Sequence, residues 1–331
     1  MSLASVFMRV PITLSLHIPN YNLPGTGPDQ VFERLAEIAT TAEASGFSSL
    51  SVMDHLHQIG PVGPPENWMF EGSTMLAAIA ARTSRLTLGL LVGSVTYRNP
   101  AIAAKTTTTL DIISGGRAWH GIGAGWFEAE HVAYGYDYPT LKTRFEMLEE
   151  ALQIARAMFT REQASFTGKH FRVDGAYNNA RPLRGDIPIL IGGSGERKTL
   201  RLVAKYGDGC NLFGDAARVR HLLGVLQAHC DDVGRDYAQI TKTGTGRVLI
   251  APTHEQAEAK KTTLRERGVP QESIDSMISG DPDTVAEQAA ELRDAGLEGF
   301  CFSMPGNEDP ETVALAGAAL SQVFAPVAVA A

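Results

Sequence analysis

The amino-acid sequence predicts an α/β fold, a closed (β/α)8 barrel of the TIM type with small insertions. Three observations predict it. Strand-like and helix-like segments alternate eight times, no polar linker or change of composition divides the chain, and 331 residues are enough for one large barrel. We therefore expect a single barrel domain over residues 1–331 rather than two smaller doubly wound domains.

The first half of the chain supplies four predicted strand and helix pairs. The segment 11–18 alternates apolar and polar residues like a strand, and the helical spacing of 28–46 ends at a glycine. Asn99 and Pro100 have the residue types of a helix N-cap and first turn. The expected elements are strands 11–18, 47–54, 85–92 and 116–123, and helices 28–46, 72–84, 99–114 and 141–159.

The second half continues the alternation after one predicted interruption. Residues 164–176 have the pattern of a small hairpin insertion. The short apolar run 186–193 is typical of a strand buried on both faces. The expected elements are strands 186–193, 208–214, 245–252 and 297–305, and helices 196–207, 215–233, 283–296 and 310–323. The apolar segments 75–81 and 314–323 suit either a homodimer face or the core.

Composition excludes several classes of function. A net charge of -8 and a pI of about 5.6 argue against a nucleic-acid partner, which usually needs a basic patch. The sequence has no run of 18 apolar residues, so we expect no membrane span. The first 16 residues do not have the pattern of a signal peptide. The three cysteines have no CxxC spacing, so we expect neither disulfides nor a zinc site, and a cytoplasmic location.

Asp54 and His55 end the second predicted strand. The carboxyl ends of barrel strands form the face on which barrel enzymes place their active sites. A histidine there can give or take a proton near neutral pH, and an adjacent aspartate can orient it or bind a hydroxyl group. The alternative is a capping aspartate beside a surface histidine.

Small residues end the third and fourth predicted strands. The sequence GIGAGW at 121–126 resembles a dinucleotide-binding turn, but Trp126 stands at the last glycine position and more than a hundred residues precede it. Gly125 would instead let a flat ligand approach the backbone of the fourth strand, unless it only turns the chain. Gly93 and Ser94, after the third strand, could present backbone groups to a heterocycle or form an ordinary loop.

The fifth predicted strand leads through IGGSG directly into a helix. The unpaired amides and the positive end of the helix dipole would converge there, so residues 192–195 predict a phosphate site, with loop punctuation as the alternative. Arg197 and Lys198, expected in the first helical turn, oppose the dipole unless an anion is near.

Other segments give weaker signals. His17, Asn20 and Tyr21 are expected near the same mouth, although a structural histidine is as good an interpretation. Residues 68–70 (WMF) form either a lid over the substrate or packing under a long loop. Glu128, Glu130 and His131 lie within four positions, but without a second cluster they do not predict a metal site.

These motifs together resemble the bacterial luciferase-like monooxygenase superfamily, in its branch of oxidoreductases that use the deazaflavin coenzyme F420. The resemblance rests on VMDH (52–55), on 89–135, on 189–211 and on 280–300, and it covers nearly the whole chain beyond residue 10. Members that use flavin mononucleotide (FMN) share the same scaffold.

The resemblance implies a ring across the barrel mouth and a phosphate at the turn after the fifth strand. His55 is implied as the catalytic residue. The residues implied in cofactor binding are Asp54, His55, Leu91, Val92, Gly93, Ser94, Gly125, Trp126, Gly192, Gly193, Ser194 and Gly195. A non-prolyl cis peptide is implied at the end of the third strand, at Leu91–Val92 or an adjacent bond. Trp126 stands where sugar-phosphate dehydrogenase members have an acidic residue, which argues against a sugar phosphate as substrate.

The expected function is hydride transfer between F420 and a small organic substrate that the sequence does not identify. Two alternatives remain open at this stage. One is an FMN-dependent monooxygenase, which needs a dry pocket for its oxygen chemistry. The other is a catalytically silent protein that binds a flavin or deazaflavin.

Overall fold

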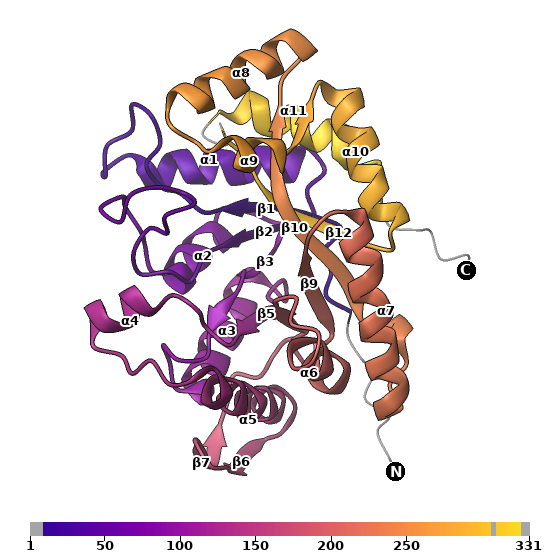
Figure 1. Cartoon of the computed structure of the whole chain (residues 1–331). Coiled ribbons are helices and arrows are strands. Elements are labelled where there is room, and N and C mark those ends of the chain that lie inside the picture. Colours follow the sequence, from indigo (N-terminus) through magenta and orange to yellow (C-terminus); the bar gives the residue numbers. More distant parts are fainter. Residues whose placement is uncertain (1–8, 306–308, 326–331) are drawn as a thin grey trace.

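The computed structural model describes residues 9–305 and 309–325 and places a parallel sheet at the centre of the molecule (Figure 1). Neighbouring strands follow the path β3-β2-β1-β12-β10-β9-β8-β5-β4, and every pairing along it is parallel. The strands are β1 Leu14–Ile18, β2 Ser49–Val52, β3 Thr87–Leu90, β4 Gly93–Ser94, β5 His120–Gly123, β8 Ile189–Gly192, β9 Gly209–Phe213, β10 Thr241–Ile250 and β12 Gly299–Ser303.

The two ends of this path meet, so the sheet is nearly closed into a barrel. β3 and β4 are successive pieces of one strand, interrupted at Leu91 and Val92. A parallel bridge between Leu88 and Ala118 joins β3 to the segment that leads into β5. Counted with β3 and β4 as one, the barrel has the eight predicted strands, which confirms the (β/α)8 prediction.

Helices cover the outside of the barrel (Figure 1). Because both faces of the sheet are then covered, the strands are buried along nearly their whole length, as in other parallel sheets. The eight helices that alternate with the strands are α1 Val31–Ala44, α2 Gly72–Ala80, α3 Pro100–Ser114, α5 Leu141–Thr160, α6 Thr199–Tyr206, α7 Ala216–Val233, α10 Pro282–Asp294 and α11 Pro310–Leu320.

Helix termini follow the local sequence. Asn99 Oδ1 accepts a hydrogen bond from the Ala101 amide at 2.9 Å, and Pro100 occupies the first turn of α3, as predicted. α6 begins at Thr199, so Arg197 and Lys198 lie in the turn before it and not in its first turn, which corrects the predicted boundary. The turn takes up three residues after Gly195 before helical geometry begins.

Two insertions interrupt the alternation. The antiparallel hairpin of β6 Gln163–Thr167 and β7 Arg172–Tyr177 confirms the predicted one and extends below α5 (Figure 1). After β10 the chain forms elements that the sequence analysis did not assign. These are α8 His254–Glu266, α9 Gln271–Asp275 and β11 Ile278–Gly280, which pairs with β10.

The barrel interior is filled around Trp119, which is 1 % exposed. Gly89 and Gly121 make room for its indole, because a Cβ at either position would lie within 2.7 Å of the ring. The side chains that share this inner core are Val10, Ile12, Leu190 and Cys301, with Leu91 and Val92 packed against them. The barrel is therefore closed below its mouth, and a ligand can enter only above this layer.

The apolar helices serve the core. Leu76 and Ile79 of α2 and Ala316 and Leu320 of α11 are buried, so these segments supply core packing, one of the two interpretations left open. Within residues 9–305 and 309–325, no helix is long and apolar enough to cross a membrane. Residues 1–8, which carry half of the segment compared with a signal peptide, lie outside the described residues.

Candidate active site

A cavity of about 590 Å³ opens at the carboxyl ends of the barrel strands. Its size lies within the range of small-molecule sites, about 300 to 1,000 Å³. The structure brings together there all twelve residues predicted for the site: Asp54, His55, Leu91, Val92, Gly93, Ser94, Gly125, Trp126, Gly192, Gly193, Ser194 and Gly195. They come from the carboxyl ends of four barrel strands, namely β2, the strand made of β3 and β4, β5 and β8, and from the bends that follow them.

His55 is held at the edge of this cavity by a buried carboxylate. Its Nδ1 lies 2.7 Å from Glu130 Oε1, and its ring makes an edge contact with Trp126 at 5.5 Å between ring centres. The His55 side chain is 15 % exposed and that of Glu130 is fully buried. The imidazole is therefore fixed in orientation while one edge remains accessible.

Glu130 lies in α4 Glu128–Tyr134, and its carboxylate accepts several hydrogen bonds. The Leu56 amide donates to Oε2 at 2.6 Å, the His57 amide at 3.3 Å, and the Tyr97 hydroxyl donates to Oε1. Burial alone would raise the pKa of Glu130, but the hydrogen bonds from His55, Tyr97 and Leu56 outweigh it and hold the pKa below its usual range. An ionised carboxylate only accepts, so Nδ1 of His55 carries a hydrogen, and Nε2 is the ring nitrogen left to exchange a proton with a ligand.

Glu130 was not predicted as a site residue, because its spacing with Glu128 and His131 raised only the question of a metal ligand. Its neighbour His131 is also buried, with Nδ1 on the Phe127 carbonyl oxygen at 2.7 Å and Nε2 on Thr96 Oγ1 at 2.6 Å, while Glu128 is exposed. No metal-binding group of three or more His, Cys, Asp or Glu side chains exists in the described part of the chain. Two adjacent polar residues on a short helix after the fourth barrel strand were the available signal.

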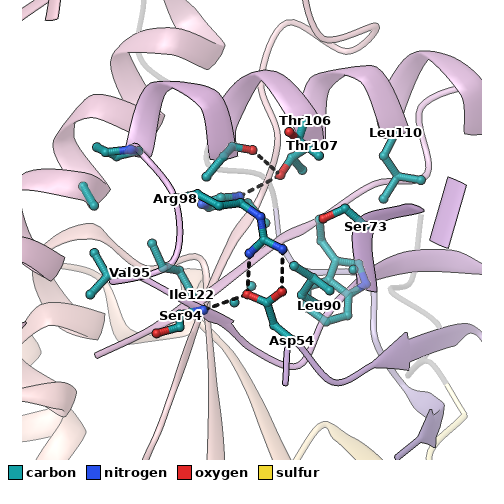
Figure 2. Close-up of a pocket in the computed structure, with 18 of the residues that line it drawn as sticks. Asp54, Ser73, Leu90, Ser94, Val95, Arg98, Thr106, Thr107, Leu110 and Ile122 are labelled. Carbon is teal, nitrogen blue, oxygen red and sulfur yellow. Dashed lines mark hydrogen bonds and ion pairs between the residues drawn. The ribbon is translucent and has the colours of Figure 1, made fainter. Parts of the chain in front are cut away.

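Asp54 faces a guanidinium rather than open solvent (Figure 2). Arg98 donates to both of its carboxylate oxygens, at 2.7 and 2.8 Å, and the Ser94 amide donates to Oδ2 at 3.0 Å. Arg98 also binds Glu71 at 2.6 Å. Burial would lower the pKa of Arg98, but these two carboxylates raise it. Asp54 thus ties the end of β2 to the end of the third strand, a connection absent from the sequence analysis.

The peptide bond Leu91–Val92 is cis, at the first of the predicted positions. The Val92 side chain lies against the ends of β5 and β8, since a Cβ at Gly192 would meet it at 2.7 Å and one at Gly123 at 3.0 Å. Val92 therefore lies across the floor of the mouth. A second cis bond, Asn179–Ala180, lies outside the cavity.

The bend after β5 requires its glycine. Gly125 has φ +73, and a Cβ there would come within 2.5 Å of Ser94 Oγ. This gives the glycine a conformational reason of its own, whether or not a ligand approaches. Trp126 follows with 58 % of its surface exposed.

The turn 192–195 lines the cavity and includes two backbone amides without a hydrogen-bond partner in the described part of the chain. Ser194 Oγ accepts from the Phe213 amide at 2.9 Å, and Gly193 donates to the Asn211 carbonyl oxygen at 3.3 Å. The backbone N–H groups of Ser194 and Gly195 make no hydrogen bond within the described part of the chain. Free amides beside the start of α6 form a concave donor set that suits an anion.

Of the residues with weaker sequence signals, some line the cavity and others do not. His17 lines the cavity, with Nδ1 3.0 Å from Ser51 Oγ, and burial together with the neighbouring His55 lowers its pKa to about 4. Tyr21 is buried against Phe70 and does not line the cavity, nor does Asn20. Residues 68–70 pack against the core, so the packing interpretation holds for them. Ile59 and Val62 of the same long loop reach the mouth instead.

Comparison with known proteins gives the same picture. A family model described as luciferase-like monooxygenase matches residues 8–267. The chain is 30% identical over 312 residues to an F420-dependent glucose-6-phosphate dehydrogenase of Nocardia farcinica (strain IFM 10152), covering 83% of this chain and 88% of that protein.

Two solved structures share the fold. One is an F420-dependent secondary alcohol dehydrogenase in complex with an F420-acetone adduct, with a TM-score of 0.78, 19% identity and coverage of 96% of this chain and 99% of that one. The other is the oxygenating constituent of 3,6-diketocamphane monooxygenase from Pseudomonas putida in complex with FMN. Its TM-score is 0.72 at 18% identity, with coverage of 96% and 98%.

Proposed function

The chain belongs to the luciferase-like monooxygenase family, and from this premise we propose that it is an oxidoreductase that transfers a hydride between coenzyme F420 and a small organic substrate. The observation that carries the proposal is the convergence of four strand ends on one cavity with a proton-accepting edge of His55 and free amides at Ser194 and Gly195. The relative from Nocardia farcinica, whose name specifies F420, supports the choice of cofactor.

The residues of the mouth fit such a cofactor. Glycines at 192, 193 and 195 leave the turn without side chains except Ser194, and the free amides there suit a phosphate. The Leu91–Val92 backbone and Gly125 would lie against the ring. When bound, F420 supplies a carbon centre that accepts or donates a hydride.

The protein's own part is to orient and to move a proton. We propose that Nε2 of His55 exchanges a proton with the substrate oxygen, because Glu130 holds the hydrogen on Nδ1. Asp54 and Arg98 hold the ends of β2 and the third strand in register beneath it. Exclusion of water falls to the apolar side chains of the rim, among them Trp126.

FMN is the alternative cofactor, and one titration decides between the two. Purified apoprotein is titrated with F420 and, separately, with FMN, following the spectrum of each. We expect tight binding of F420 and weak binding of FMN. Tight binding of FMN alone would replace the proposal with an FMN-dependent monooxygenase. Tight binding of F420 without turnover on a broad substrate panel would indicate the silent binding protein.

We further propose that the chain acts as one domain in the cytoplasm and as a homodimer. Support for the location comes from Cys210, Cys230 and Cys301, which are free and buried. Support for a dimer comes from α3, where Ile102 and Ile113 are 59 % and 46 % exposed. Light scattering on the purified protein measures the oligomeric state.

A further inference from the structure

The cavity carries no cationic side chain. None of the described residues that line it is lysine or arginine, and the undescribed residues 1–8, 306–308 and 326–331 contain neither type. Arg98, which touches the cavity residue Asp54, is occupied by two carboxylates. Lys198 is exposed and follows the turn 192–195 that we assign to the cofactor phosphate, with Nζ 5.1 Å from the ring of the cavity residue Phe145. A buried anionic group of a substrate would therefore find no lysine or arginine in the described lining to pair with.

Apart from Asp54, which is paired with Arg98, the polar groups of the mouth are not carboxylates. His17 is enclosed, hydrogen-bonded through Nδ1 to Ser51, and burial keeps it uncharged at neutral pH. Thr245 and Ser303 add hydroxyl groups, and the Asn211 amide is already bound to Thr243 Oγ1 at 3.0 Å. These groups can bind a hydroxyl or carbonyl oxygen, but they do not offset a full negative charge.

The rim is apolar and partly exposed. Trp126 and Phe213 line the cavity with 58 % and 56 % of their surface accessible, and Ile59, Val62 and Leu141 are among the other apolar residues of the lining. Large exposed aromatic side chains at a cavity opening are typical of binding sites for apolar ligands, because the bound ligand removes their apolar surface from water. Trp126 lies directly beside His55, the proposed proton acceptor.

On the premise of the proposed function, we propose that the substrate is an uncharged, mainly apolar alcohol or the matching carbonyl compound, and that Trp126 selects it by packing beside His55. Oxidation of the alcohol breaks its carbinol C–H bond and its O–H bond as the C=O bond forms. The C–H hydrogen leaves with both electrons as the hydride that oxidised F420 accepts, and the O–H proton passes to His55 Nε2. The substrate therefore differs in charge from the sugar phosphate named for the Nocardia farcinica relative.

The test measures binding as well as turnover. F420 affinity is measured first. The F420-loaded protein is then titrated calorimetrically with cyclohexanone and with glucose 6-phosphate, and reduction of F420 is followed with cyclohexanol and with glucose 6-phosphate. We expect binding and turnover with the neutral compounds only.

Variants locate the selectivity. Trp126→Glu should weaken cyclohexanone binding by about 10- to 100-fold, because it replaces the apolar wall with a charge. Trp126→Phe, which keeps an aromatic ring, should retain most of the affinity. Trp68→Phe is the matched control, since Trp68 packs against the core away from the cavity.

The outcomes separate the two proposals. Failure of F420 to bind overturns the proposed function and this inference with it. Binding of F420 together with preference for glucose 6-phosphate, or with no affinity for either class, overturns the substrate assignment alone. An unchanged cyclohexanone affinity in Trp126→Glu overturns the role of Trp126.

Discussion

At the scale of single residues, the pairing of His55 with Glu130 defines the candidate site. The two residues are 75 positions apart, and the contact is 2.7 Å. The position of His55 at a strand end was sufficient to predict it from the sequence. Glu130 could not be predicted as its partner, because the pairing depends on how α4 packs over the end of β2.

Replacement of His55 by alanine tests proton transfer. The proposal predicts a loss of turnover of about 10²- to 10⁴-fold, the usual contribution of a general acid or base. F420 affinity should change little, because the cofactor's phosphate is assigned to the amides of Ser194 and Gly195. Steady-state kinetics with a separate F420 titration checks both. A variant with unimpaired turnover would remove His55 from the mechanism.

Replacement of Glu130 by glutamine tests the buried carboxylate by its acid dependence. The pKa of Glu130 in the folded protein lies below its ordinary value of 4.5. Its ionised form therefore stabilises the fold above pH 4.5, and this stability is lost as pH falls through the lower folded pKa. At pH 7 the free energy of unfolding of the variant should be lower than that of wild type by about 1 to 3 kcal/mol. This difference should become smaller as the pH falls below 4.5.

The matched control for that variant is Glu128→Gln in the same helix, since Glu128 is exposed. Urea unfolding of wild type and both variants across about pH 3 to 7 gives the comparison. If both variants lose the same free energy of unfolding relative to wild type at every pH, the role assigned to Glu130 is contradicted.

At the scale of elements, the sequence predicted the barrel strands well and the late insertion not at all. Strands buried on both faces appear in the sequence as apolar runs, and an N-cap residue such as Asn99 indicates where its helix begins. In contrast, α8 buries only Ala257 among its residues, so no apolar stripe signalled it. The start of α6 was also misplaced, because the turn 196–198 has helix-compatible residues.

The bend after β5 offers a test with a built-in control. Gly125 and Gly135 both have φ +73, but a Cβ at 125 would meet Ser94 Oγ at 2.5 Å, whereas one at 135 meets nothing within 4 Å. Alanine at either position costs about 1 to 2 kcal/mol in backbone strain. Only Gly125→Ala should also weaken F420 binding. Thermal unfolding and F420 titration of both variants check this. Equal F420 affinities in the two variants would show that the bend at Gly125 takes no part in cofactor binding.

At the scale of the whole molecule, closure of the sheet creates the site. The bridge between Leu88 and Ala118 joins the third and fourth barrel strands near their starts, and the pairing of β4 with β5 joins their carboxyl ends. Trp119 fills the interior below the mouth. The alternation of elements predicted this closure and hence the convergence of the strand ends. The charge balance and apolar rim of the mouth could not be predicted in this way, because they depend on which loop side chains reach the cavity.

A crystal structure of the protein with F420 is the most direct test of the central claim. We predict the ring in the mouth between His55 and the Leu91–Val92 bond, with the phosphate on the amides of Ser194 and Gly195. A cofactor bound anywhere else, or a phosphate held away from that turn, would contradict the account.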